Sequence, residues 1–87
     1  MATKAKPTKA RHQVHLTFPE HLINEPVLSL LAKRFDVVFN IRGSTVTSDM
    51  ALVALELDGR DSEITKAIAW LKAKGVSVEP MGRSAIN

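Results

Sequence analysis

Cysteine is absent from the 87 residues of this chain, and long apolar runs are absent as well. Without cysteine there is no disulfide framework, no thiolate nucleophile, and no soft ligand pair for a zinc ribbon or a metal chaperone. No apolar run approaches the ~18 residues of a membrane span, and the N-terminus lacks the apolar core of a signal peptide. We therefore expect an intracellular, cytoplasmic protein, and the length indicates one domain.

Acidic residues are missing from the first twelve positions. Residues 1–12 contain four basic side chains, which are Lys4, Lys6, Lys9 and Arg11. The remaining residues carry eight basic and nine acidic side chains, so the body of the protein is close to neutral. We expect residues 1–12 to form a disordered basic tail, because they also lack an apolar pattern. Such a tail increases solubility, and it could also contact nucleic acid.

Four segments have the composition of strands. Residues 13–18 alternate strictly between apolar and polar side chains, which is typical of a half-buried strand. The other predicted strands are 37–46, 51–57 and 76–78. A polar turn at 47–49 makes an antiparallel hairpin of the second and third strands, and Gly43 suggests a bulge in the second. Beyond a folded domain over residues 13–81, we expect a loose tail over 82–87.

Two segments have the periodicity of helices. The first is predicted to begin at Asn24 and to end before Asp36, and the second to be capped by Asp61 and ended by Gly75. The order strand, helix, hairpin, helix, strand predicts an α+β protein with a ferredoxin-like βαββαβ fold. Two right-handed crossovers then place both helices on one face of a four-stranded antiparallel sheet.

No helix remains to cover the other face of this sheet, which we call the open face. Alternation predicts that it carries Gln13, His15, Thr17, Val38, Asn40, Arg42, Leu52, Ala54, Glu56, Ser77 and Glu79. We expect Val38, Leu52 and Ala54 to gather there as an apolar centre, and an uncovered apolar centre indicates a partner. Because so short a chain buries a small core, a homodimer is expected.

Several activities found on this fold lack the residues they need. No aromatic side chain is predicted on the open face, so bases of RNA have nothing to stack on. His12, His15 and His21 do not share ligand spacing on one element, and no base is fixed beside the hydroxyls of the hairpin. The loop after the first strand has no glycine to hold an anion. We expect a binding protein without catalysis, metal or cofactor.

The hairpin stretch from Asn40 to Thr45 places an amide, a glycine and two hydroxyls beside an apolar sheet. A small zwitterion needs such a site, with polar groups for its charged end and apolar surface for its side chain. An ordinary hairpin with a glycine bulge accounts for the same residues.

The sequence resembles the NIL domain, the ferredoxin-like, ACT-like regulatory domain at the C-terminus of methionine importer ATPases. The resemblance covers roughly residues 13–81. It is carried by Leu16-Thr17-Phe18, Pro26-Val27-Leu28-Ser29-Leu30-Leu31, Phe35-Asp36-Val37, Asn40-Ile41 with Gly43, Ala67-Ile68-Ala69-Trp70-Leu71 and Gly75-Val76-Ser77-Val78-Glu79. One departure is Arg42, which stands where the family motif has leucine. The resemblance implies a dimer that binds methionine near its interface, here as a freestanding small protein.

The ligand-binding residues expected on this basis lie in and beside the hairpin. Asn40 would bind the polar end of an amino acid, which the resemblance implies is methionine. Ile41, Val38 and Leu52 would shape the apolar part. Gly43 and Ser44 could offer backbone N–H groups. Two other functions remain open: an adaptor that binds only a protein target, and a nucleic-acid-associated protein that uses the basic N-terminal arm.

Overall fold

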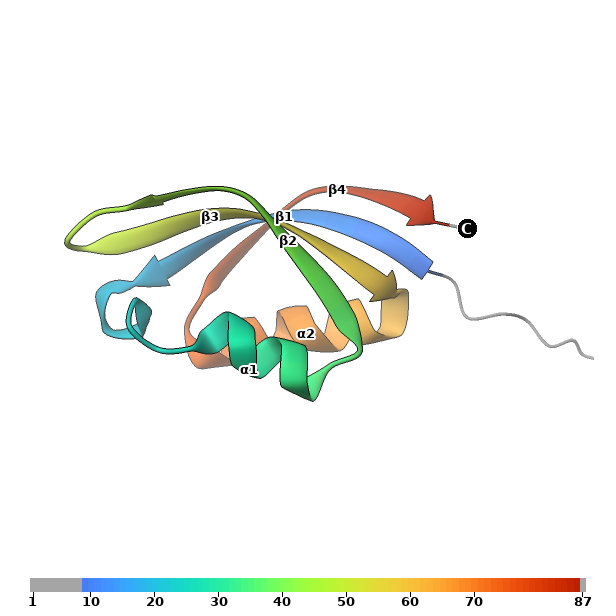
Figure 1. Ribbon diagram of the computed structural model, residues 1–87, viewed down its shortest axis with the longest axis horizontal. Helices are drawn as coiled ribbons and strands as arrows, with labels where there is room; N and C mark the ends of the chain where they lie inside the picture. The colour runs from blue at the N-terminus through green and yellow to red at the C-terminus, as the bar shows by residue number, and fades with distance from the viewer. Residues whose placement is uncertain (1–8, 87) are drawn as a thin grey trace, which may run out of the picture.

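The computed structural model describes residues 9–86, which form one sheet and one layer of helices (Figure 1). The elements are β1 (Lys9–Pro19), the short 3-10 helix η1 (Glu20–Leu22), α1 (Val27–Arg34), β2 (Val37–Val46), β3 (Met50–Arg60), α2 (Asp61–Lys74) and β4 (Ser77–Ile86). The strands pair antiparallel in the order β2-β3-β1-β4. Both helices lie on the same face of the sheet, so the expected ferredoxin-like fold is confirmed.

The core lies between this sheet face and the helices. Its fully buried side chains come from alternate positions of β1 and β3 and from one stripe of each helix. The largest of them are Leu16, Leu31, Leu55, Leu57, Ile64, Leu71 and Val14. The alternation of β1 and the helical spacing of α1 and α2 therefore identify the core from the sequence.

The first helix begins later than the sequence predicts. Asn24 lies in a turn, and α1 starts at Val27 after Pro26. Proline disfavours the helical conformation of the residue before it, which excludes Glu25 and with it Asn24 from the helix. Asp61 also differs from its expected role, because it makes no side-chain capping bond at the start of α2. Gly75 does end α2, with a φ of 105°.

The inner strand β1 and the edge strand β4 extend beyond the boundaries predicted from the sequence. Lys9 pairs with both Arg60 of β3 and Ile86 of β4, and Ala10 is fully buried. Residues 9–12 are thus part of β1 rather than of a tail, and residues 82–86 are part of β4 rather than loose. Ladder hydrogen bonds and ion pairs hold these ends, and neither requires an apolar alternation. The remainder of the expected basic tail, residues 1–8, lies outside the described residues.

The hairpin of β2 and β3 has the predicted turn and the predicted bulge. Thr47 Oγ1 accepts hydrogen bonds from the backbone N–H groups of Asp49 and Met50, both at 3.2 Å. In β2 the pairing shifts between Ile41 and Gly43, so that Arg42 has no partner on β3. Within residues 9–86, no helix is long and apolar enough to cross a membrane.

Candidate functional site

A hollow of about 610 Å³ lies on the open face toward the hairpin end of the sheet. We call it the sheet hollow. Its lining residues are His15, Leu16, Thr17, Gly43, Ser44, Thr45, Leu52, Val53, Ala54 and Glu79, which come from all four strands. The side chain of Leu52 is 45% exposed. An apolar floor, two threonine hydroxyls and a carboxylate are thereby brought together on a surface that no helix covers.

The hollow exists because small residues occupy its middle. Gly43, Ala54, His15 and Glu79 face one another in a row across β2, β3, β1 and β4. Ala54 contributes only a methyl group, and a Cβ added to Gly43 would have no heavy atom within 4 Å. Gly43 also has no positive φ. Neither backbone conformation nor packing in the chain therefore requires glycine at this position.

The bulge at Arg42 determines which side chains of β2 reach the open face. Before the bulge, Val38 and Asn40 are paired with Asp58 and Glu56 of the open face. After it, Thr45 is paired with Leu52, whereas Ser44 is paired with the half-buried Val53. A β-bulge of this kind often changes the direction of a side chain next to a binding site. Here the bulged Arg42 lies on the open face between the two groups.

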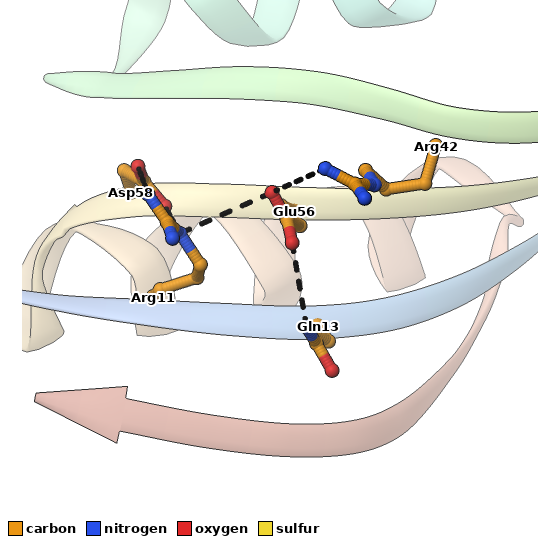
Figure 2. A network of polar contacts seen from close by, with 5 residues as sticks. All are labelled: Arg11, Gln13, Arg42, Glu56 and Asp58. Atoms are coloured by element: carbon orange, nitrogen blue, oxygen red, sulfur yellow. Dashed lines mark hydrogen bonds and ion pairs between the residues drawn. The ribbon is translucent and has the colours of Figure 1, made fainter.

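Next to the sheet hollow, a network of ion pairs and hydrogen bonds covers part of the open face (Figure 2). Arg11 donates from Nε and Nη2 to the two carboxylate oxygens of Asp58, both at 2.9 Å. This hydrogen bonding lowers the pKa of Asp58 and raises that of Arg11. Glu56 is only 8% exposed although no helix covers it. It is covered by Gln13 Nε2 at 3.3 Å, Arg42 Nη1 at 3.7 Å and Arg11 Nε at 3.9 Å.

A second, smaller hollow of about 350 Å³ joins these ion pairs to the sheet hollow. We call it the charged hollow, and its lining includes Gln13, His15, Arg42, Ala54, Glu56 and Met81. His15 and Ala54 line both hollows, so the two are adjacent on the open face. The combined groove has an apolar end at Leu52 and a charged end at Arg42.

The residues predicted for ligand binding are divided among four places. Gly43, Ser44 and Leu52 line the sheet hollow. Asn40 is exposed and belongs to the next open-face pair, opposite Glu56, so it lies beside the hollow rather than in its lining. Ile41 lies on the helix side of β2, paired with the core residue Leu55, and is 54% exposed.

Val38 lies at the far end of the sheet, where it lines another hollow with Asp58, Arg60 and Ile86. The prediction that Val38, Leu52 and Ala54 gather as an apolar centre is therefore wrong. Val38 pairs with Asp58 and Leu52 with Thr45, which separates the two by six residues of β3, roughly 20 Å. Alternation assigns residues to a face, but only the register places them along it.

Several lining residues were not singled out by sequence reasoning as site residues. His15, Thr17, Ala54 and Glu79 were assigned to the open face, but their meeting in one hollow depends on the register of three strand pairs. For Thr45 the sequence predicts only that it belongs to the hairpin. No local pattern in the sequence carries that register.

A separate polar cluster joins three elements on the helix side of the sheet. Asp61 at the start of α2 accepts hydrogen bonds from Arg83 of β4, and His12 Nε2 of β1 lies 3.0 Å from Asp61 Oδ1. Arg83 and then His12 hold the pKa of Asp61 far below its usual range. Among residues 9–86, no group of three or more histidine and carboxylate side chains could hold a metal ion.

Comparison with known proteins identifies the relatives of this chain. Residues 12–80 match the NIL domain family. The chain is 29% identical over 72 residues to methionine import ATP-binding protein MetN 1 of Bacillus licheniformis, which covers 78% of this chain and 22% of that relative. It is 34% identical over 70 residues to the MetN 1 protein of Listeria innocua, covering 76% of this chain and 21% of the relative. The chain thus matches about a fifth of the length of each relative.

Proposed function

The chain belongs to the NIL domain family, and on this premise we propose that it is a non-catalytic module that binds an amino acid, with methionine as the first candidate. Both relatives are named as methionine import proteins. The ligand would lie in the sheet hollow, and binding there would regulate a target protein. The observation that carries the proposal is a concave, partly apolar site on an open sheet face in a chain of this family.

The lining of the sheet hollow suits an amino acid with an apolar side chain. Ligand sites combine apolar surface with a few polar groups that fix the orientation of the ligand. Leu52 and Ala54 offer apolar surface, while Thr17 and Thr45 offer hydroxyls. Gly43 and Ser44 bring the backbone of the bulged strand to the rim. Of the residues expected from the sequence, the proposal keeps Gly43, Ser44 and Leu52 in the lining, with Asn40 beside it.

The same residues give little support for catalysis. A serine or threonine nucleophile needs a base within hydrogen-bond reach. In the described part of the chain, His15 makes no hydrogen bond to any of the hydroxyls that line the hollow with it, and His12 is engaged with Asp61 instead. Binding is therefore the function that the geometry favours.

Dimerisation is the second part of the proposal. A sheet face without helices leaves Val38, Leu52 and Met81 exposed by 65%, 45% and 51%. A second copy of the chain would remove such side chains from water. Sedimentation at increasing concentration tests this part separately: the proposal requires a species of twice the 9.5 kDa chain mass at micromolar concentration. A monomer up to millimolar concentration would contradict it.

Thermal unfolding in the presence of each of the twenty amino acids tests ligand binding. A ligand at 100 times its dissociation constant stabilises the folded state by about 2.7 kcal/mol. For a domain of this size that corresponds to a rise in the melting temperature of roughly 10 °C or more. We expect this rise with methionine, and calorimetry should then give a stoichiometry of one ligand per chain. If no amino acid raises the melting temperature, amino-acid sensing is excluded and a ligand-free adaptor takes its place.

A further inference from the structure

The two arginines of the open face differ in how firmly they are held. Arg11 is held firmly, because its guanidinium donates two hydrogen bonds to Asp58 in a bidentate manner, both at 2.9 Å. Arg42 has one ionic contact, at 3.7 Å to Glu56, and its side chain is 66% exposed. A guanidinium has five N–H donors in a planar fork that matches a carboxylate. Arg42 therefore has donors left for a second carboxylate.

Glu56 does not depend on Arg42 alone. Gln13 donates to Glu56 Oε2 at 3.3 Å, and Arg11 Nε lies 3.9 Å from Oε1. Figure 2 shows Gln13 and Arg42 approaching Glu56 from opposite sides. If Arg42 turned toward a ligand, the buried carboxylate would keep two polar neighbours. The large cost of an unpaired buried charge is thereby avoided.

The row of residues that starts at Gly43, the neighbour of Arg42, ends at a carboxylate on the far edge strand. Gly43, the neighbour of Arg42 in the bulge, faces Ala54, then His15, then Glu79 on β4. The backbones of β2 and β4 in this row are three strand spacings apart, roughly 14 Å. The arginine and glutamate side chains cover part of this distance from the two sides. Ala54 and His15 lie between them, and the short side chain of Ala54 leaves space for the charged groups of one amino acid.

From this arrangement we infer that Arg42 binds the α-carboxylate of the ligand, while Glu79 binds its ammonium group. The ligand's apolar side chain then lies along Ala54 toward Leu52, at the apolar end of the groove. The inference rests on the proposed function and adds its selectivity: the site recognises a zwitterion, and it binds compounds that lack a free carboxylate more weakly.

Calorimetry with methionine and methioninamide tests the role of Arg42. The two compounds share the side chain and the amine, and at about pH 6.5 the amine of both is protonated. We expect the wild-type chain to bind methionine at least about 10-fold more tightly than the amide, in line with a charge-assisted hydrogen bond. In Arg42→Leu, methionine affinity should fall to that of the amide, while amide affinity changes little. Arg42→Lys should retain part of the preference.

The control is Arg60→Leu, which removes the same charge about six residues of β3 away from Ala54 and should leave both affinities unchanged. Equal binding of methionine and the amide by the wild-type chain would overturn the inference but leave the proposed function standing. So would an equal loss for both ligands in Arg42→Leu, because a structural role of Arg42 does not distinguish them. If the wild-type chain binds no amino acid at all, the proposed function fails, and the inference fails with it.

Discussion

The two faces of the sheet consist of alternate residues of the same strands, but they are held by different forces. On the helix side, Leu16, Leu55 and Leu57 are removed from water almost completely. On the open face, Glu56 reaches a similar burial through Gln13 and two arginines rather than through apolar packing. The first kind of burial is insensitive to small displacements of partners and supports the fold. The second depends on particular atoms, so it suits a surface that must select what it binds.

Truncating one leucine on each face should give the largest contrast. Leu57→Ala leaves a cavity in the core and should lower the free energy of unfolding by about 2–5 kcal/mol. Leu52→Ala, on the open face, should cost about 1 kcal/mol or less, because its side chain is already 45% exposed. Urea unfolding followed by circular dichroism measures both. Comparable losses in the two variants would mean that the open face is covered in solution, as in a tight dimer.

Acid should weaken both faces through different carboxylates. The pKa of Asp58 on the open face is lowered by Arg11, and that of Asp61 on the helix side by Arg83 and His12. A carboxylate with a lowered folded-state pKa stabilises the protein above its unfolded pKa, and this stabilisation is lost as the pH falls through the folded value. We therefore expect stability to decrease steadily below about pH 4.

Two single variants show how much of the acid-induced loss of stability comes from each face of the sheet. Asp58→Asn and Asp61→Asn should each be less stable than the wild-type chain at pH 7 and should each show a shallower decrease of the urea midpoint between about pH 5 and 2. Glu63, whose pKa is lowered first by the backbone N–H of Asp36, keeps part of the dependence in both variants. A pH dependence unchanged in both variants would show that these ion pairs do not form in solution.

The smallest expected change in stability comes from Gly43→Ala. The added methyl group meets open space, and the backbone has no positive φ there. Because alanine restricts the unfolded chain more than glycine does, the folded state should gain about 0.4–1 kcal/mol. The methyl group also projects into the sheet hollow, so methionine affinity should fall while stability rises. Thermal unfolding with and without ligand measures both effects, and a variant that binds as well as the wild-type chain would place the ligand elsewhere.

The sequence predicts the covered face far better than the open one. Leu16 and Leu31 are recognised as core residues because alternation and helical spacing are local patterns. Arg42 could be assigned to a face, but its proximity to Glu56 depends on how β2 and β3 align, and the bulge changes that alignment. Alternation likewise assigns Val38 and Leu52 to the same face, but the register places them far apart along it. The composition of residues 82–86 predicts a loose tail, although they belong to β4, because ladder hydrogen bonds leave no trace in composition.

The unpaired residue in β2 also limits how the length of the hairpin can change. Side chains of a strand alternate with a period of two, so one extra residue reverses the parity of everything that follows it. Deleting Arg42 would remove this extra residue and leave the later pairs unchanged, so Thr45 would stay on the open face and Ser44 and Val46 on the helix side. Removing two residues at the turn would shorten the hairpin but keep its parity. Length changes of even number and the deletion of the bulged residue are therefore tolerated here, whereas any other single insertion or deletion in β2 requires a new bulge or exchanges the two surfaces of the hairpin.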